Sequence, residues 1–478
     1  MFRSACLMLA AASLALAGCA DEPPTPAVSP DDKAQAAEQH QELLAEMGGA
    51  YRGEEAAYVA EVGERLARAA GIGGQCTFTV VNTDVVNAFA VPGCYIYVTR
   101  GLLGWVNSEG ELASVLGHEL GHIVGNHSHE QMKRSLLRSL GVLAVGAITG
   151  SDQLTRIAGQ AAGFFDLRYS RTHEYEADDL GLLYLRKAGY DPYAASQMLT
   201  ALDRSSTFQA GARGAQDAQR IPEWQLTHPL TANRIARARR EAEKTGLKPD
   251  ALPEFEARYL GHLDGLLYGD DPEQGFVLGR RFAHPVMRIA FEAPEGFTLT
   301  NSPQAVVIDG PQGTQGEFAG GPLPPGGLEP YAEALLGQIV GQAPVEVVSS
   351  VAGQTNGLPS AVVQAVAQAE GGPATISLAV YDGGDGSAYH FVLVSRPGAG
   401  APAGARDLFR SFHRLGAADV ATLKPRFIRI RAVQPGEDAR GLAARMAADR
   451  PAELFRLLNG LDANARLRVG QSVKLVTR

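Results

Sequence analysis

The feature that most constrains this chain of 478 residues is the pentad His118-Glu119-Leu120-Gly121-His122. It lies in an apolar pattern of helical period, and a helix brings side chains four residues apart to one face, about 40° apart around the axis. His118 and His122 can therefore reach a single ion, and neutral imidazole suits Zn²⁺. Glu119 projects to one side, where it can act on a water bound to that ion. The pentad thus predicts a zinc site.

A helix is expected to begin near Glu109, because Ser108 and Glu111 have the spacing of a capping box. Apolar residues between 112 and 124 give this helix a broad apolar side. Two histidines and a glutamate on a buried helix need polar partners, which a metal ion supplies. A hydrogen-bonded pair of core histidines is the alternative interpretation.

Zinc requires a third protein ligand, and one candidate follows the pentad directly. The extended pattern H-E-x-x-H-x-x-G-x-x-H fits at Gly125, but its last position is Ser128, with His127 and His129 on either side. A shift of one residue turns a helical side chain by about 100°. Neither histidine therefore inherits the role.

The better candidate is Glu174, which shares a face of a second expected helix with Asp178, four residues later. Glu174 can bind the metal, whereas Asp178 can accept the second N–H of a ligand histidine and fix its tautomer. Glu176 points elsewhere and is expected to be a surface charge. A charged, solvated helix without a metal role is the alternative for this segment.

With these motifs the chain resembles the zinc metalloendopeptidases related to HtpX and the CAAX prenyl proteases, in particular the BepA-like periplasmic quality-control peptidases. The resemblance covers about residues 35 to 245 and includes segments 87–93, 98–103 and 227–234. The chain departs from the family pattern at Cys94, where such proteins usually carry a glycine. It also lacks TPR-like helical repeats in its C-terminal half.

The resemblance implies a mainly helical zincin-type (gluzincin) domain with a small β-sheet, in which His118, His122 and Glu174 hold one Zn²⁺. A sheet edge would lie beside the zinc, and an extended substrate can add to such an edge as a strand. The residues of this edge are Asn87, Ala88, Phe89 and Ala90.

The resemblance also draws attention to His228 and Arg234. The matching histidine in relatives approaches the zinc, where it blocks the metal or helps to stabilise the oxyanion; otherwise His228 is a plain loop histidine. Glu119 and His228 are therefore the candidate catalytic residues. Arg234 either braces the site or contacts an acidic ligand, with a surface salt bridge as the alternative.

The N-terminus has the pattern of a lipoprotein signal peptide. A positive residue, Arg3, precedes an apolar stretch from Leu7 to Ala17, which is too short to span a bilayer as a stable helix. The stretch ends in Leu16-Ala17-Gly18-Cys19, which resembles a bacterial lipobox and implies cleavage before Cys19 and its lipidation. Ala20, in place of an aspartate, favours the outer membrane. An ordinary secretory signal is the alternative.

The sequence has four cysteines. Cys6 lies in the segment expected to be removed and Cys19 is expected to be lipidated, which leaves Cys76 and Cys94. The periplasm permits disulfides, but the sequence does not show whether the two Cα atoms lie within bonding range. Pairing and two buried free thiols are therefore both open.

The length of the chain predicts two or three domains. The fold class expected for the whole chain is α+β. The expected divisions are a signal peptide at 1–18, a Pro-rich tether at 19–31, a metallopeptidase domain at 32–265, a β-rich α+β domain at 276–420 and a small βααβ module at 425–478. Residues 276–420 show no metal spacing or nucleophile pattern. A role in holding partners or substrates is expected for them.

The last stretch predicts strand, helix, helix, strand at 427–433, 438–447, 451–458 and 472–476, and it resembles a LysM module. The resemblance implies binding to peptidoglycan glycan. Glu437-Asp438 stands where Asp-Thr is usual, so retained glycan binding is left open. A net charge of −9 without a basic run argues against nucleic acid as a partner.

Together these features predict a periplasmic, lipid-anchored zinc endopeptidase that hydrolyses misfolded or stalled envelope proteins. The alternative is a non-proteolytic chaperone or a peptidoglycan-binding scaffold with a latent zinc site, closed by His228 or by a loop.

Overall fold

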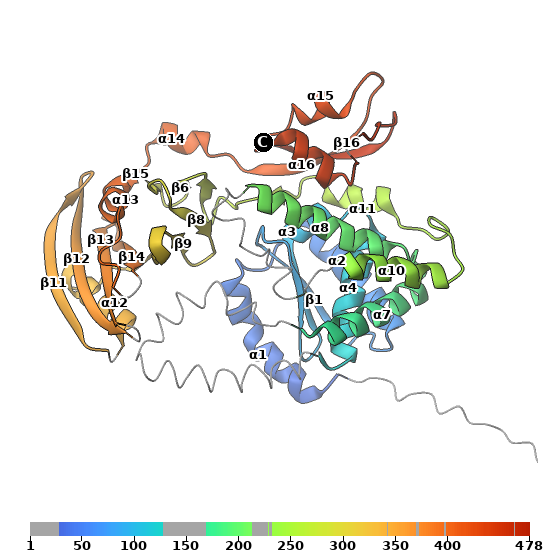
Figure 1. The fold of residues 1–478 in the computed structure, drawn as a ribbon, viewed down its shortest axis with the longest axis horizontal. Coiled ribbons are helices and arrows are strands. Elements are labelled where there is room, and N and C mark those ends of the chain that lie inside the picture. The colour runs from blue at the N-terminus through green and yellow to red at the C-terminus, as the bar shows by residue number, and fades with distance from the viewer. Residues whose placement is uncertain are drawn as a thin grey trace, which may run out of the picture.

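The computed structural model describes residues 28–127, 169–212, 228, 232–341, 343–369, 372–395, 398–462 and 464–478. The predicted signal peptide, Cys19, most of the expected tether and His129 lie outside these residues. Helices dominate the N-terminal body and strands dominate a second body, which confirms the α+β class (Figure 1). None of the described helices is both long and apolar enough to cross a bilayer.

The N-terminal body is a helical assembly around one buried apolar core. Its described helices are α1 (Pro30–Glu46), α2 (Glu54–Ala69), α3 (Arg100–Trp105), α4 (Glu109–Val124), α7 (Arg171–Lys187), α8 (Ala194–Ala212), α10 (Ala232–Lys244) and α11 (Glu256–Leu263). The predicted start of α4 at Glu109 is confirmed, and the Ser108 side chain accepts a hydrogen bond from the Glu111 amide. The second hydrogen bond of the expected capping box is different. The Glu111 carboxylate accepts from the Asn107 amide and not from the Ser108 amide.

A three-stranded sheet lies in the same body, with β1 (Thr77–Val81), β3 (Tyr95–Thr99) and β2 (Ala88–Val91) in the order β1-β3-β2. Within the described residues β2 is therefore an edge strand, preceded by Asn87. Ala88, Phe89 and Ala90 are all buried. The addition of a substrate strand at this edge stays a prediction.

A disulfide joins Cys76 and Cys94 in the structure, with the Cα atoms 4.7 Å apart. Cys94 has a φ of 59°, in the left-handed region that favours glycine. A glycine would adopt this backbone conformation without strain. In this chain the cross-link ties the start of β3 to the residue before β1.

The second body is built on antiparallel strands (Figure 1). A seven-stranded sheet has the order β11-β12-β13-β14-β10-β9-β8, and a four-stranded sheet has the order β15-β7-β6-β5. The strands are β5 (Phe276–Leu278), β6 (Arg281–His284), β7 (Ile289–Glu292), β8 (Thr298–Asn301), β9 (Val306–Asp309), β10 (Gln315–Pro322), β11 (Val345–Thr355), β12 (Leu358–Ala369), β13 (Gly372–Asp382), β14 (Ser387–Val394) and β15 (His413–Arg414). The short helices η1 (Pro311–Gly313), α13 (Ala405–Ser411) and α14 (Ala417–Thr422) connect them.

Alternating side chains of the seven-stranded sheet belong to two separate apolar cores, one on each face of the sheet. On β13, Leu378 and Val380 pack beneath helix α12 (Leu328–Val340), whereas Ala379 and Tyr381 join an aromatic core on the opposite face. Phenylalanines from β6, β7, β10 and β14 fill that aromatic core. The alternation explains why this stretch of sequence is rich in short apolar runs.

The C-terminal unit has the predicted order strand, helix, helix, strand, with β16 (Arg426–Ala432), α15 (Ala439–Ala443), α16 (Pro451–Leu458) and β17 (Ser472–Thr477). Helix α15 ends earlier than predicted, because the Ala447 amide donates a hydrogen bond to the Val476 carbonyl on β17. The likeness to LysM stays a prediction.

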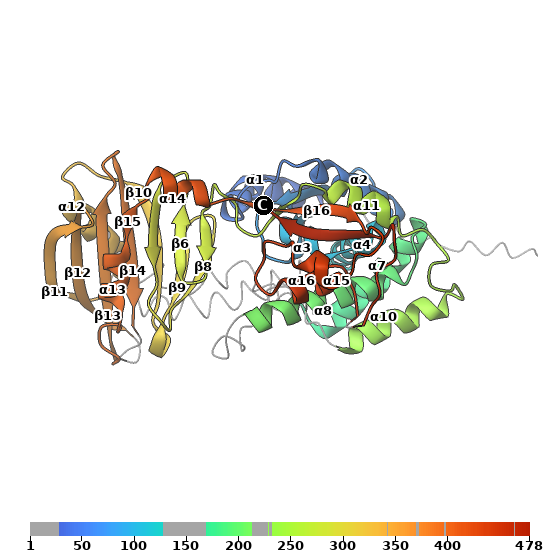
Figure 2. The same cartoon turned by 90° about the horizontal axis from the view of Figure 1, so that it is seen from above.

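The C-terminal unit packs against the helical body instead of standing apart (Figure 2). Its residues Ile428, Phe455 and Val476 belong to the same apolar core as the residues of α4. Strand β4 (Leu267–Tyr268) also pairs with β16. The buried Lys474 ammonium donates hydrogen bonds to the Gly104 and Val106 carbonyls, at the end of α3.

Candidate metal centre

Helix α4 supplies the first half of the site. His118, Glu119 and His122 are at most 2% exposed, although all three side chains are polar. The helical spacing brings the two imidazoles together, with His118 Nε2 3.1 Å from His122 Nε2. The structure therefore unites the predicted pair at one point on the buried side of α4.

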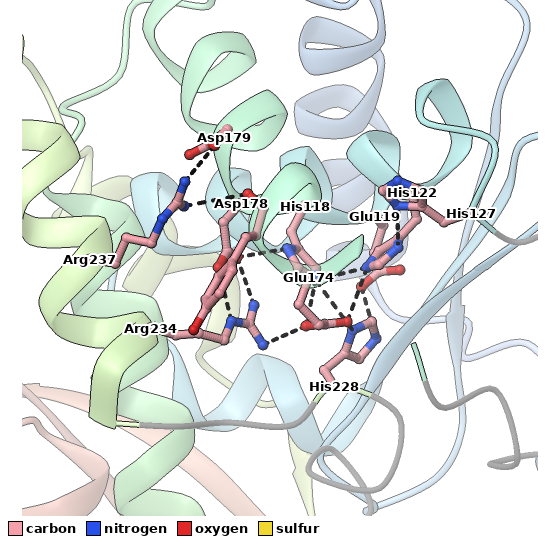
Figure 3. A network of polar contacts seen from close by, with 11 residues as sticks. His118, Glu119, His122, His127, Glu174, Asp178, Asp179, His228, Arg234 and Arg237 are labelled. Atoms are coloured by element: carbon pink, nitrogen blue, oxygen red, sulfur yellow. Dashed lines mark hydrogen bonds and ion pairs between the residues drawn. The ribbon is translucent and has the colours of Figure 1, made fainter. Parts of the chain in front are cut away.

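Helix α7 supplies the second half, and glycines allow it to approach α4 closely. A Cβ atom on Gly121 would lie 2.7 Å from the Ala177 carbonyl oxygen, and one on Gly181 would lie 3.0 Å from the His118 amide nitrogen. Any larger side chain at either position would push the helices apart. The close approach lets Glu174 and Asp178 reach the histidines of α4 (Figure 3).

Four buried side chains converge on one point: His118, His122, Glu174 and His228. His228 Nδ1 lies 3.3 Å from His118 Nε2 and 3.0 Å from Glu174 Oε1. Glu174 Oε1 lies 3.5 Å from His122 Nε2, and Glu174 Oε2 lies 3.6 Å from His118 Nε2. Two ligand atoms bound to a tetrahedral zinc at about 2.0–2.1 Å lie about 3.4 Å apart. The spacing of the four donors matches this geometry.

The tautomer of His118 also favours a cation at this point. His118 Nδ1 lies 3.0 Å from Asp178 Oδ1. Burial raises the pKa of Asp178, but the charge of Arg234 and the hydrogen bond to His118 outweigh it and lower that pKa to about 2. An ionised carboxylate only accepts, so His118 Nδ1 carries the proton. His118 Nε2 then presents a lone pair to the cluster, where a metal ion can accept it.

Arg234, on α10, braces the carboxylates of α7. Its guanidinium is 1% exposed and forms ion pairs with both Glu174 and Asp178. Burial by itself raises the pKa of Glu174, but the charges of His228 and Arg234 outweigh it and hold the pKa well below its usual range. Glu174 is therefore an ionised carboxylate with a fixed orientation, which suits a metal ligand.

Glu119 stands beside the cluster without a strong partner. Its side chain is fully buried, and neither carboxylate oxygen has a hydrogen-bond partner in the described part of the chain. The nearest cluster contact is His228 Nε2, 3.6 Å from Glu119 Oε1. Burial raises the pKa of Glu119, and the charges of His228 and His118 oppose it. A buried carboxyl group in this position needs a hydrogen-bond partner, and the described residues do not provide one.

His228 lies inside the donor set, as the resemblance implied. Burial lowers its pKa, but the carboxylates of Glu174 and Glu119 reverse that effect and raise it. Nδ1 of its ring faces Glu174, and Nε2 faces Glu119. His228 can thus bind a metal or interact with a group bound to it.

Two residues that were not predicted as part of the site, His127 and Tyr169, contact the ring of His122. His127 Nδ1 lies 3.1 Å from His122 Nδ1, on the side away from the cluster. The Tyr169 ring stacks on the His122 ring with centroids 3.8 Å apart. His127 is therefore brought to the site behind His122 and not among the four donors.

Comparison with known proteins matches residues 54–242 to the family described as Peptidase family M48. A beta-barrel assembly-enhancing protease of Yersinia pestis is 32% identical over 228 residues, which cover 45% of this chain and 44% of that protein. The Escherichia coli (strain K12) protein of the same name is 28% identical over 213 residues, which cover 42% of each chain. A mitochondrial metalloendopeptidase of Arabidopsis thaliana is 40% identical over 116 residues, covering 24% of this chain and 23% of that protein.

These matches confirm the resemblance to zinc metallopeptidases for the helical body, where all four donors lie. The chain spans less than half the length of each of these relatives. The β-rich body and the C-terminal unit both lie beyond the region matched to the family.

Proposed function

We propose, from the match of residues 54–242 to Peptidase family M48, that this protein is a zinc-dependent endopeptidase of the bacterial envelope. The observation that carries the proposal is the convergence of four buried donors, within 4.8 Å of one another, beside a buried carboxyl group. Such a set matches the ligand types and the open position of a catalytic zinc site. Three ligands, His118, His122 and Glu174, leave room for a water.

Zinc, when bound, lowers the pKa of a coordinated water and polarises the scissile carbonyl. Glu119 would then act as the general base and acid, taking a proton from the attacking water and giving it to the leaving amine. Burial raises the pKa of Glu119, and a raised pKa makes the carboxylate a stronger base toward that water. Asp178 and Arg234 orient His118 and Glu174 and keep both in the state that binds metal.

His228 supports a second, related proposal, in which the enzyme is held latent. Its Nδ1 already lies among the ligand atoms. A neutral imidazole is a good fourth zinc ligand, and in that position it displaces the nucleophilic water. A chaperone or scaffold with a permanently closed site is the extreme form of this arrangement.

The substrates and location are also part of the proposal. Two relatives are named beta-barrel assembly-enhancing proteases, and by analogy the substrates here are unfolded or misassembled envelope polypeptides. The lipobox-like segment ending at Cys19 favours a lipid anchor in the outer membrane. The C-terminal unit would contact peptidoglycan, because its order of strand, helix, helix and strand is like that of a LysM module.

The decisive experiment measures zinc content and casein cleavage for the full chain and for Glu119→Gln. We expect about one zinc per chain in both proteins, with cleavage lowered at least 100-fold in the variant, because general acid–base catalysis contributes about 10²–10⁴-fold. Removal of zinc with a chelator should abolish cleavage, and added zinc should restore it. Casein cleavage that persists in the metal-free chain, or a wild-type chain that binds no zinc, would overturn the proposal.

A further inference from the structure

Strand β11 forms one margin of the seven-stranded sheet, and in Figure 1 it is the strand farthest from the metal centre. It runs for 11 residues and pairs only with β12 among the described residues. Every position from Val345 to Gln354 is exposed, on both faces of the strand. The outer margin of β11 thus presents a row of backbone N–H and C=O groups that no described strand pairs.

Two exposed valines of β11 continue the apolar layer of the sheet that lies under α12. Val345 and Val347 stand opposite Ala367 and Ala365, which are buried beneath α12. Helix α12 packs over β12 and β13 but does not extend over β11. The two valines therefore form an uncovered extension of a buried apolar layer. On the opposite face Val351, which pairs with Val362, is also exposed.

The sequence of β11 has few of the devices that protect sheet edges. Native edges are commonly blunted by lysine, proline or inward-pointing charges. The strand has one charged residue, Glu346, and no proline or lysine, whereas four valines are 38–64% exposed. One protective device is present, a register shift between Val347 and Ser349. The seven residues from Ser349 to Thr355 remain a regular, unprotected edge.

We propose that β11 is a docking strand that captures extended segments of non-native envelope polypeptides by adding them to the sheet. Backbone hydrogen bonds would supply binding that is independent of sequence, and the exposed valines would select segments with alternating apolar residues. This inference rests on the proposed function, since such segments are what unfolded β-rich envelope proteins expose. It gives the β-rich body a substrate-holding role outside the metal centre.

The size of the edge favours a transient polypeptide ligand over a second copy of the chain. A strand of this length is about 36 Å long, and neighbouring strands lie about 4.8 Å apart. A strip of these dimensions is far smaller than the roughly 800 Å² that each partner of a stable complex buries. Edge-to-edge pairing of two copies would therefore be weak. A long substrate can also contact the metal centre, so a weak hold at β11 is sufficient for it.

The test uses a fluorescent 12-residue peptide of alternating valine and threonine, with anisotropy as the readout. The protein is the full chain with Glu119→Gln, so that the probe is not cleaved. We expect Val347→Lys with Val351→Lys to weaken binding at least tenfold, since charges on an edge oppose strand addition. The matched control is Val286→Lys with Val469→Lys, at valines that are 68% and 67% exposed elsewhere, and it should bind as the parent does.

A second probe tests the backbone contacts on the unaltered strand, whether or not the lysine variant folds. The same peptide, N-methylated at every second residue, cannot form a ladder and should bind at least tenfold more weakly. Equal binding of the two peptides, or equal binding by the parent and a folded β11 variant, would overturn the proposal. So would a parent dimer in ultracentrifugation that the β11 variant converts to a monomer, because β11 would then be covered by a second copy.

Failure of this inference can be distinguished from failure of the proposed function. Binding of the peptide at β11 needs no metal, so a chelator should leave the difference between the parent and the β11 variant unchanged. Casein cleavage by the zinc-loaded chain reports on the metal centre alone. A chain that cleaves casein but fails the peptide tests keeps the proposed function and loses the docking strand.

Discussion

The metal centre and the β-rich body place their polar groups in opposite ways. Between α4, α7 and α10, histidines, carboxylates and an arginine are buried against one another. In the β-rich body the aromatic core is apolar, and His390 is a rare buried titratable group near α12. Buried ionisable groups cost free energy unless partners satisfy them. The metal centre therefore keeps buried ionisable groups that its chemistry requires, whereas the aromatic core of the β-rich body serves packing.

The two regions should therefore respond differently to single changes. At the metal centre, each residue holds the charge or tautomer of another, so one substitution should propagate through the cluster. In the β-rich body, a substitution should change local stability and leave metal binding intact. The predictions below test this difference, in order of their expected effect on the metal centre.

The largest effect is expected for Glu174→Ala. The substitution removes an ionised ligand and leaves Arg234 and the histidines without their main counter-charge. Zinc affinity should fall by more than the roughly 100-fold that changes behind the ligands cost. Competition with a chromophoric chelator measures it. Asp179→Ala is the matched control, because Asp179 lies on the same helix with an exposed side chain; a similar loss in both variants would remove Glu174 from the ligand set.

A smaller effect is expected for Asp178→Ala. Its carboxylate accepts from His118 Nδ1 and fixes the tautomer that presents Nε2 to the metal. Zinc affinity should fall by about 10- to 100-fold, as is typical of such partners. The exposed neighbour Asp179, which pairs with Arg237, offers the control Asp179→Ala. If zinc affinity in Asp178→Ala equals that of the control, the tautomer argument is wrong.

His228→Ala should change cleavage while zinc and fold are retained. Because His228 Nδ1 lies within the donor set, we expect its removal to free the water position and raise the casein cleavage rate several-fold. A fall in rate would assign His228 to stabilisation of the transition state instead. No change in either rate or thermal stability would make it an ordinary loop residue.

The least effect on the metal centre is expected from His390, which should govern acid stability of the β-rich body. Burial lowers the pKa of His390 from 6.5 to about 4. Above pH 6.5 the His390 imidazole is neutral in both the folded and the unfolded state. Between pH 6.5 and 4 the unfolded state takes up the proton first, so the free energy of unfolding falls by about 3 kcal/mol, at about 1.4 kcal/mol per pH unit.

Urea unfolding of the full chain and of His390→Gln at pH 7 and pH 4.5 measures this contribution. The variant should lose less stability on acidification than the parent does, with zinc affinity unchanged at pH 7. An identical pH dependence in the two proteins would show that His390 titrates normally. A loss of zinc affinity in the variant would break the proposed independence of the two regions.

Much of the metal centre could be predicted from local spacing. The interval of four between His118 and His122, and between Glu174 and Asp178, sets their shared faces on any helix. The start of α4 at Glu109 likewise follows from its cap, and it agrees with the structure. Family resemblance singled out His228 and Arg234, which the fold brings to the same cluster.

Other features had no local signal that could decide them. The contact between His127 and His122 depends on how the chain turns after α4. Burial of Lys474 beneath the carbonyls of Gly104 and Val106 depends on docking between segments about 370 residues apart. The exposure of β11 depends on where α12 ends over the sheet, which the valine-rich sequence alone did not indicate.

The sequence by itself determined which side chains share a helix face, because helical geometry depends only on neighbouring residues. It determined the metal-binding chemistry for the same reason, through the residue types at those positions. Only the tertiary structure decided that α4 and α7 meet at their glycines, and that Arg234 and His228 reach the cluster from a later segment. Contacts between distant segments arise from packing of whole faces, and no single stretch of sequence carries that information.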